Sequence, residues 1–193
     1  MRIFVAGASG VIGRALVPLL CRAGHEVAGM TRSPERTAAI AQLGAQPVLC
    51  DVYDAGGLSR AVQDFAPEMV MHQLTDLPDD IKRLPLYIGR NNRIRTEGTR
   101  NLVAAAREAG ALRFLAQSIE FSAPGVGKAV AEHERLVLEF GGVVLRYGLF
   151  YGAGTFGGTR KPPIGPRIHV EAAARRTVEF LEAASGVYRV VEE

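Results

Sequence analysis

Residues 2–15 read Arg-Ile-Phe-Val-Ala-Gly-Ala-Ser-Gly-Val-Ile-Gly-Arg-Ala, an apolar run followed by three glycines spaced three residues apart. The run predicts a strand, and the residues after Gly10 predict an amphipathic helix. Gly7 permits a tight turn out of the strand. Gly10 lets the backbone approach a pyrophosphate closely, and Gly13 lets the helix pack against the sheet. The stretch therefore predicts a dinucleotide-binding turn, and the alternative is a glycine-rich strand-to-helix turn without a ligand.

The first turn of the predicted helix explains why phosphates bind at such a place. Its backbone N–H groups have no partner within the helix, and the helix dipole adds partial positive charge there. The residues that we expect to contact the cofactor in this turn are Gly7, Ser9, Gly10, Val11, Ile12 and Gly13.

Strands and helices are predicted to alternate along almost the whole chain of 193 residues. Short apolar runs separated by helical patterns are typical of a parallel sheet with right-handed crossovers. We therefore predict an α/β protein with a doubly wound parallel sheet, a Rossmann fold of about seven strands flanked by helices, as a single domain over 1–193. The predicted strands are 2–6, 26–30, 46–50, 68–72, 113–117, 143–147 and 187–191. The predicted helices are 11–23, 34–43, 55–65, 91–109, 129–140 and 171–184.

Two segments lack a regular pattern. Residues 148–167 are rich in glycine and proline and are expected to be a short irregular loop on the substrate side. Residues 74–86 are expected to join the fourth strand to a long helix. The substrate-binding region is thus predicted to be reduced.

Composition excludes several classes of protein. The net charge is +3 and the basic residues are spread out, so the arginine clusters predict solvated helix faces and no nucleic-acid partner. We find no apolar run long enough for a membrane span, and the chain enters a core strand at once, with no room for a signal peptide. Cys21 and Cys50 are expected to be small buried residues. We therefore expect a soluble cytoplasmic protein with no membrane partner and no metal.

The end of the second predicted strand indicates which dinucleotide is preferred. It reads Gly-Met-Thr-Arg-Ser over 29–33, with no carboxylate before Glu35. Arg32 would form charge-assisted hydrogen bonds with a 2′-phosphate, and Thr31 and Ser33 could add hydroxyl donors. This favours NADP(H) over NAD(H). NAD(H) stays the alternative, because an arginine at this place can also stack on adenine or simply be solvated.

The ends of the third and fourth predicted strands complete the expected cofactor site. Asp51 and Val52 close the third strand, where a carboxylate could accept a hydrogen bond from the adenine amino group; a turn or helix N-cap is the equal alternative. Gln73 and Leu74 follow the fourth strand and are expected along the phosphate–ribose segment. We interpret His72 as a structurally hydrogen-bonded histidine, not a catalytic one.

Several stretches together resemble one enzyme family. They are Gly7–Gly13, Asp51-Val52, residues 98–102 (Gly-Thr-Arg-Asn-Leu) with Ala104-Ala105, Gln117-Ser118, residues 145–155 (Leu-Arg-Tyr-Gly-Leu-Phe-Tyr-Gly-Ala-Gly-Thr) and residues 168–170 (Ile-His-Val). In this order the chain resembles extended short-chain dehydrogenase/reductases, most of all NAD(P)-dependent epimerase/dehydratase-like members, including atypical ones. The resemblance implies a Ser/Thr–Tyr–Lys catalytic group and a nucleotide-sugar or related carbonyl or hydroxyl substrate.

The resemblance assigns catalytic roles only in part. It places Ser118 as the hydrogen-bond donor to substrate, with a strand-end serine as the alternative, and Lys128 as the lysine that assists a tyrosine. Four residues before Lys128, however, stands Pro124, where the family has its tyrosine. The interval from Ser118 to the following helix is also shorter than the family's usual loop.

A substitute proton donor would have to come from elsewhere. We predict Tyr151 as the first candidate, with Tyr147, Glu120 or water as alternatives. Two functional hypotheses follow. The first is an NAD(P)-dependent reductase, dehydrogenase or epimerase that acts by hydride transfer. The second is a non-catalytic NADP(H)-binding sensor or structural protein. Beside these two hypotheses stands a third possibility, a shortened or divergent descendant that is selected for its fold more than for activity.

The resemblance also suggests an oligomer. In this family the helices that correspond to 91–109 and 129–140 often pair between subunits. We therefore expect a homodimer contact built from Leu102, Val103, Leu136, Val137 and Phe140, and the alternative is that these side chains pack on their own sheet.

Overall fold

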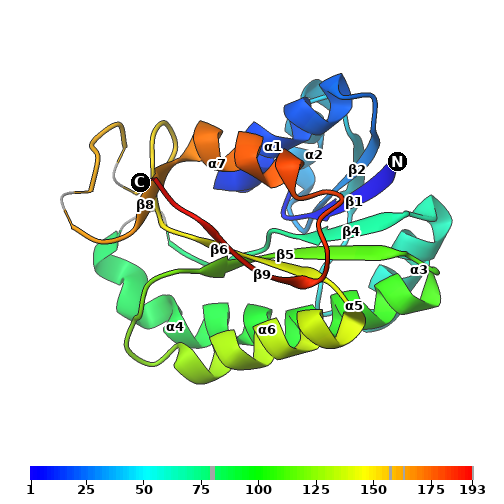
Figure 1. Cartoon of the computed structure of the whole chain (residues 1–193). Helices are drawn as coiled ribbons and strands as arrows, with labels where there is room; N and C mark the ends of the chain where they lie inside the picture. The colour runs from blue at the N-terminus through cyan, green and yellow to red at the C-terminus, as the bar shows by residue number, and fades with distance from the viewer. Residues whose placement is uncertain (79–80, 157, 163, 193) are drawn as a thin grey trace.

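The computed structural model describes residues 1–78, 81–156, 158–162 and 164–192. Its centre is a parallel sheet of seven strands in the order β3-β2-β1-β4-β5-β6-β9 (Figure 1). The order reverses between β1 and β4, which creates the switch point where ligands bind in open α/β sheets. The strands are β1 (Arg2–Ala6), β2 (Glu26–Thr31), β3 (Gln46–Leu49), β4 (Met69–His72), β5 (Arg113–Ile119), β6 (Val143–Tyr147) and β9 (Gly186–Val190). The doubly wound α/β fold is confirmed.

Helices cover both faces of the sheet (Figure 1). On one face lie α1 (Val11–Arg22), α2 (Thr37–Gln42) and α7 (Val170–Glu179). On the other lie α3 (Ala55–Phe65), α4 (Leu84–Arg93), α5 (Thr99–Glu108) and α6 (Gly127–Phe140). This arrangement explains why strands such as β6 are apolar along most of their length.

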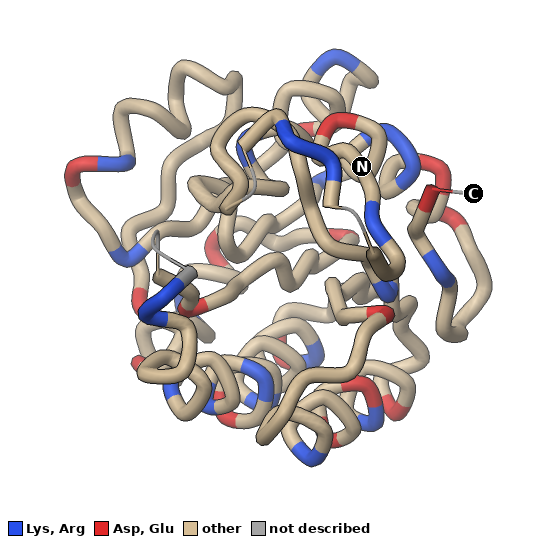
Figure 2. The backbone as a smooth tube through the Cα atoms, turned by 90° about the vertical axis from the view of Figure 1, so that its left-hand side faces the viewer, with Lys and Arg blue, Asp and Glu red and all other residues tan. Residues whose placement is uncertain are grey.

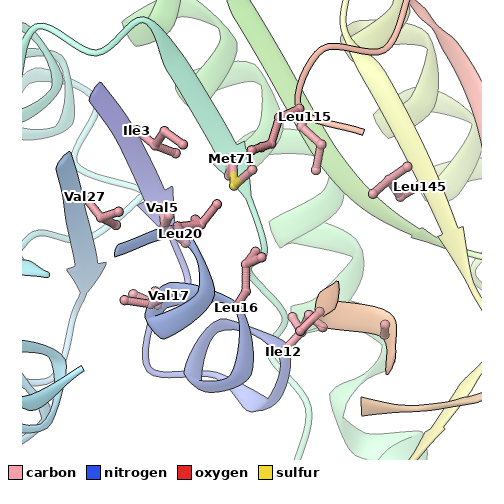
Figure 3. Packing of buried hydrophobic residues seen from close by; sticks show 14 of the residues in the cluster. Ile3, Val5, Ile12, Leu16, Val17, Leu20, Val27, Met71, Leu115 and Leu145 are labelled. Atoms are coloured by element: carbon pink, nitrogen blue, oxygen red, sulfur yellow. The ribbon is translucent and has the colours of Figure 1, made fainter. Parts of the chain in front are cut away.

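Each face of the sheet has its own apolar core. Ile3 and Val5 of β1 point to the α1 side and pack with Leu16 and Leu20 of that helix (Figure 3). Phe4, between them in the sequence, belongs to the core on the opposite face. All five side chains are fully buried. Each such burial contributes about 2 kcal/mol to stability, so these contacts fix the glycine turn that joins β1 to α1.

The long helix differs most from the sequence prediction. It begins at Leu84 as α4, not at residue 91, and Pro85 stands in its first turn, where proline is tolerated. A π-helical turn, η3 (Ile94–Gly98), joins α4 to α5 without a break. Such turns widen a helix locally and frequently occur at functional sites.

Several other helices and strands differ in their bounds from the sequence prediction. The predicted helix 34–43 is a 3-10 turn, η1 (Pro34–Arg36), followed by α2, and α7 ends at Glu179. A further 3-10 turn, η2, covers Ile81–Arg83. The prediction of an irregular loop over 148–167 was wrong in part, because β7 (Leu149–Tyr151) pairs in parallel with β8 (Arg167–His169). Cys21 and Cys50 are unpaired and only partly buried.

Among the helices of the described residues, none has both the length and the hydrophobicity needed to cross a bilayer.

Candidate functional site

The glycine turn has the tight geometry that the sequence predicts. Gly7 has a φ of 96°, and a Cβ placed on it would lie 2.6 Å from the Gln73 carbonyl oxygen. A Cβ on Gly13 would lie 2.3 Å from the Gly7 oxygen, so only glycine allows this approach of helix and turn. Both contacts are with backbone atoms, which cannot move aside.

The N-terminus of α1 is open to a ligand. Gly10 caps the helix without a side-chain hydrogen bond, so the N–H groups of the first turn are available. A Cβ on Gly10 would meet only the Gly7 oxygen, at 3.2 Å, and no other heavy atom within 4 Å. This cradle fits a pyrophosphate, because the donors and the space for the anion are at the same place.

Gln73 lies beside this turn at the end of β4. Its side chain is 2% exposed, and neither amide atom has a hydrogen-bond partner of ordinary geometry among the described residues. Its contact with the Tyr147 hydroxyl, which opposes the effect of burial on the pKa of that tyrosine, does not reach ordinary hydrogen-bond geometry. A buried amide that is not fully satisfied is costly, and such groups call for a ligand or water. This amide is a second observation that fits a bound polar group at the carboxyl edge of the sheet.

The end of β2 carries hydroxyl groups and one arginine. Ser9 Oγ donates to Thr31 Oγ1 over 3.3 Å, and the Ser33 N–H donates to the same oxygen over 3.2 Å. Arg32 is paired with the Asp76 carboxylate at 3.6 Å, a partner that the sequence did not predict. Thr31 and Ser33 are therefore held at the position expected for the adenosine end of a dinucleotide.

The predicted residues after β3 have local roles in the structure. Asp51 Oδ1 accepts a hydrogen bond from the Tyr53 N–H at 2.9 Å, which is a turn role. Val52 is buried, and its carbonyl accepts a hydrogen bond from Asn101 Nδ2 at 2.9 Å. Neither contact excludes the adenine role that the sequence suggests, so that role stays a prediction.

A closed ring of hydrogen bonds ties the ends of β4 and β5 to α5 and α6. The Leu74 N–H donates to His72 Nδ1 (3.3 Å), and His72 Nε2 donates to Thr99 Oγ1 (3.1 Å). Thr99 donates to His133 Nδ1 (2.7 Å), and His133 Nε2 donates to the Gln117 carbonyl (2.9 Å). The Gln117 side chain returns to the Leu74 carbonyl at 3.3 Å. Because the Gln117 carbonyl can only accept, the direction of every bond and the tautomer of each ring are fixed.

Burial keeps both histidines neutral. Burial lowers the pKa of His72 well below its usual value and lowers the pKa of His133 to about 4. The two rings meet edge to face, with centroids 5.0 Å apart. The prediction that His72 is structurally hydrogen-bonded agrees with this geometry, and the ring holds the backbone of Leu74 at the carboxyl edge of the sheet.

Ser118 belongs to a second buried network. Its hydroxyl donates to Glu134 Oε1 on α6 at 2.6 Å, and Arg146 of β6 forms two hydrogen bonds with the same carboxylate, at 2.9 and 2.6 Å. The pKa of Glu134 is lowered: burial raises it, but the Arg146 and Ser118 hydrogen bonds outweigh that effect. The Ser118 hydroxyl therefore faces α6 and donates its proton to the Glu134 carboxylate.

Tyr151 lies in a separate cluster on the two-stranded sheet. Its hydroxyl donates to Glu192 Oε1 at 2.5 Å, and Lys161 pairs with the other oxygen of that carboxylate at 2.7 Å. The Tyr151 ring meets His169 edge to face, with centroids 5.1 Å apart. The hydrogen bond to Glu192 raises the pKa of Tyr151, and Lys161 and Tyr151 lower the pKa of Glu192 to about 2.

The predicted catalytic residues are not joined to one another. Lys128 is exposed in the first turn of α6. No hydrogen bond or ion pair among the described residues links it to Ser118 or Tyr151. The alternatives are also engaged: Tyr147 is buried with its hydroxyl 2.5 Å from Thr177 Oγ1, and Glu120 pairs with Arg189 at 2.5 Å. Burial raises the pKa of Tyr147, which makes it a poor acid.

The surface expected to form a dimer is partly occupied by the protein's own core. Three of the five side chains are buried against the sheet, which is the alternative to a dimer contact: Leu102, Val103 and Val137. The other two, Leu136 and Phe140, are only partly buried. The homodimer stays a prediction.

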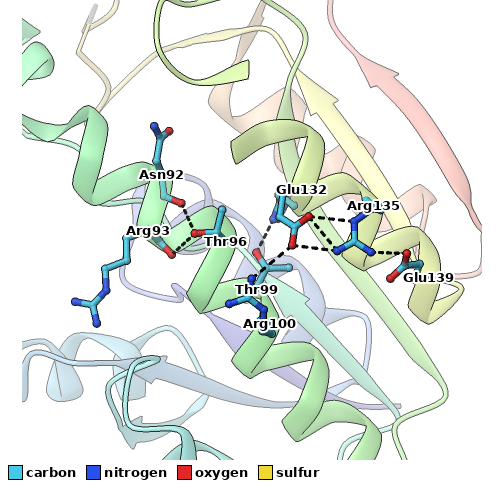
Figure 4. A network of polar contacts seen from close by, with 9 residues as sticks. Asn92, Arg93, Thr96, Thr99, Arg100, Glu132, Arg135 and Glu139 are labelled. Atoms are coloured by element: carbon cyan, nitrogen blue, oxygen red, sulfur yellow. Dashed lines mark hydrogen bonds and ion pairs between the residues drawn. The ribbon is translucent and has the colours of Figure 1, made fainter. Parts of the chain in front are cut away.

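The outer faces of α5 and α6 carry a network of charged side chains. Glu132 lies between Arg100 and Arg135, and Arg135 also reaches Glu139 (Figure 4). Exposed pairs of this kind contribute little to stability. Figure 2 shows Lys and Arg interspersed with Asp and Glu along the helices below the sheet.

Sequence reasoning missed several residues of these networks, among them Asp76, His133 and Glu134. A signal existed for Glu134, because Ser118 shares a face of β5 with Phe114 and Ala116, which pack toward α6. No comparable signal pointed to Asp76 or His133, which meet their partners only through the tertiary fold.

Comparisons with known proteins agree with this geometry. A family model described as NAD(P)H-binding matches residues 7–140. A 3-diazoavenalumate denitrifying reductase from a Streptomyces species is 37% identical over 216 aligned positions, which cover 97% of this chain and 70% of that protein. A 3-beta-hydroxysteroid dehydrogenase from Mycolicibacterium neoaurum is 32% identical over 59% of this chain, which is 31% of its own length.

Solved structures share the fold. The UDP-glucose 4-epimerase of Thermus thermophilus, in complex with NAD, aligns with a TM-score of 0.81 over 99% of this chain and 78% of that chain, at 20% identity. The UDP-glucose 4-epimerase of Thermotoga maritima aligns with a TM-score of 0.79 over 99% of this chain and 77% of that chain, at 17% identity. At such identities the likeness shows the fold alone.

Proposed function

Because the chain belongs to the NAD(P)H-binding family and its motifs resemble those of epimerase/dehydratase-like short-chain dehydrogenase/reductases, we propose that it is an NADPH-dependent reductase. The proposal takes residues 1–193 as one cofactor-binding domain. The observation that carries it is the glycine turn, where Gly7 and Gly13 admit no Cβ and Gly10 opens the N-terminus of α1. When bound, the cofactor supplies a hydride.

The chain's own residues would hold the cofactor from its two ends. The first turn of α1 binds the pyrophosphate, and Arg32 binds the 2′-phosphate that distinguishes NADPH from NADH. The proposed contact residues remain Gly7, Ser9, Gly10, Val11, Ile12, Gly13, Arg32, Asp51, Val52, Gln73 and Leu74.

The contacts of Tyr147 and Tyr151 favour a reaction that needs no phenolic acid. Tyr147 is buried against Thr177, and Tyr151 is held by Glu192. Reduction of a carbonyl requires a proton as well as a hydride, and the family obtains that proton from a tyrosine. Replacement of an aromatic diazonium group by hydrogen requires only the hydride: the new C–H bond forms, the C–N bond breaks, and its electron pair leaves with N2.

We therefore propose an aromatic diazo carboxylate as the substrate class. The 37% identical reductase supports this class, because its name joins a diazo compound to denitrification. A carbonyl or hydroxyl substrate, as the family resemblance implies, is the alternative, and it would require one of the predicted residues Ser118, Lys128 and Tyr151 to act directly.

A second candidate function is a non-catalytic NADP(H)-binding protein. The observation in its favour is that Ser118 and Tyr151 both donate to internal carboxylates, of Glu134 and Glu192. Such a protein would bind the cofactor without consuming it.

One assay separates these functions. Purified protein is mixed with NADPH and 4-carboxybenzenediazonium, and NADPH oxidation, benzoate and N2 are measured against a reaction without protein. Parallel reactions contain a benzaldehyde or UDP-glucose. We expect stoichiometric NADPH oxidation with the diazonium salt alone, and a Tyr151→Phe variant within about twofold of wild type.

Two results would overturn the proposal. The first is turnover of the aldehyde at a rate that falls a hundredfold or more in Tyr151→Phe. It would mean that Tyr151 is the proton donor and that the substrate is a carbonyl compound. Tight NADPH binding without oxidation above background would favour the non-catalytic function.

A further inference from the structure

A buried carboxylate lies between two arginines at the proposed adenosine end of the site. Asp76 follows β4, and its side chain is 9% exposed. Its Oδ1 pairs with Arg32 at 3.6 Å, and its Oδ2 accepts a hydrogen bond from Arg90 Nε at 3.1 Å. Both arginine side chains are about half exposed, at 51% and 52%. The carboxylate is thus enclosed, while the two guanidinium groups extend to solvent.

The fold fixes the carboxylate more firmly than the arginines. The Asp76 backbone N–H donates to Oδ1 of the buried Asn91 at 3.0 Å, which ties the segment after β4 to α4. Arg90 also lies over the Tyr87 ring, at 4.6 Å from its centroid. Arg90 therefore approaches from α4, whereas Arg32 approaches from the end of β2.

Arg32, Asp76 and Arg90 form a triad, and neighbouring groups place it beside the loop that follows β3. Arg93, one turn along α4 from Arg90, lies over the ring of Tyr53 at 3.9 Å from its centroid. Asp76 and Arg32 are both close enough to Tyr53 to influence the pKa of its hydroxyl. The triad thus borders the ends of β2 and β3, which the proposed function assigns to the adenosine.

We propose that Asp76 sets the cofactor preference of this protein, with Arg90 as a second phosphate-binding arginine beside Arg32. The inference rests on the proposed function for the position of the adenosine. In the absence of a 2′-phosphate, Asp76 holds the two guanidinium groups as a pair. A 2′-phosphate binds the same two groups and is repelled by the carboxylate, whereas the 2′-hydroxyl of NADH is not.

The magnitude follows from charge and distance. A carboxylate about 7 Å from a phosphate of charge −2, in a solvated site, weakens binding roughly five- to tenfold. Removing this charge strengthens NADPH binding selectively. Removing the charge of Arg90 has the opposite effect. Both effects decrease at high salt, because screening at a surface site is strong.

The test is calorimetric titration with NADPH and with NADH, which needs no substrate. Wild type is compared with Asp76→Asn, Arg90→Gln and a matched control, Glu97→Gln. Glu97 is a carboxylate on the same surface that pairs with Arg93 and not with the triad. Thermal unfolding of each variant confirms that it is folded.

We expect the ratio of the NADH to the NADPH dissociation constant to rise about fivefold or more in Asp76→Asn and to fall at least threefold in Arg90→Gln. Glu97→Gln should stay within twofold of wild type. A ratio unchanged in Asp76→Asn overturns the inference while leaving the proposed function intact. If Asp76→Asn does not fold, an unchanged ratio in Arg90→Gln has the same meaning. Folded wild type that binds neither cofactor overturns the proposed function as well.

Discussion

Acid should destabilise the protein through His133, and the structure gives the size of the effect. His133 is fully enclosed in the ring of hydrogen bonds with Thr99 and the Gln117 carbonyl. Burial lowers its pKa to about 4, whereas an unfolded histidine has a pKa near 6.5. The folded state therefore binds this proton less readily than the unfolded chain does.

The sign and range of the effect follow from that difference. The contribution of His133 to stability is complete above about pH 6.5, because both states are then neutral at this residue. As the pH falls below 6.5, the unfolded chain takes up a proton that the folded protein cannot hold. The contribution of His133 to the free energy of unfolding then decreases by ~2 kcal/mol between pH 7.5 and 5, and by ~3 kcal/mol once the pH reaches 4.

Urea unfolding followed by circular dichroism at pH 7.5, 6.5, 5.5 and 5.0 tests this reasoning. In His133→Gln the side-chain amide keeps one donor and one acceptor for the ring but does not titrate. The variant should be less stable than wild type at pH 7.5, because its hydrogen bonds are less well aligned. The difference in stability should then shrink by ~2 kcal/mol at pH 5.

A control separates this histidine from general acid effects. His25→Gln removes a partly exposed histidine beside the amino terminus and should keep most of the pH dependence of wild type. Parallel curves for wild type and His133→Gln over the whole pH range would refute the reasoning, since they would mean that His133 titrates equally in the folded and unfolded chains.

Two further substitutions test the turn and the buried serine. Gly13→Ala should cost ~3 kcal/mol or prevent folding, because its Cβ would lie 2.3 Å from a backbone oxygen. Gly127→Ala, whose Cβ would meet no atom within 4 Å, should unfold at an unchanged or slightly higher temperature; equal losses in the two variants would contradict the steric argument. Ser118→Ala should cost ~2 kcal/mol in urea unfolding, because the Glu134 carboxylate loses a buried donor. The exposed loop variant Ser122→Ala should cost nothing, and a Ser118→Ala protein as stable as wild type would show that the hydrogen bond is unimportant.

The sheet could be predicted from the sequence because each strand has a local pattern of apolar residues. β1, β6 and their neighbours are short apolar runs, and each is bounded by glycine or polar residues. The start of α4 could not be predicted in this way. Pro85 and Gly89 interrupt its helical pattern, and the π-helical turn after Arg93 shifts the helical period by one residue.

The candidate site, too, has a part that the sequence predicts and a part that only the tertiary structure reveals. The glycine turn and Arg32 could be predicted, because they are contiguous with strands whose ends share one edge of the sheet. The partner of Arg32 could not, because Asp76 lies 44 residues further along and reaches it only through the path of the chain after β4. Thr99 and His133 likewise come together only when α5 and α6 pack side by side.

The most direct test of the account is transfer of deuterium from NADPH. Protein is incubated with 4-carboxybenzenediazonium and NADPH labelled with deuterium at nicotinamide C4, in separate reactions for the two faces of the ring, and benzoate is analysed by mass spectrometry. We predict one deuterium per benzoate from one face only, at the ring carbon that carried nitrogen. Benzoate without deuterium above the protein-free reaction, while NADPH binding is retained, would contradict the claim that this chain is a hydride-transferring reductase.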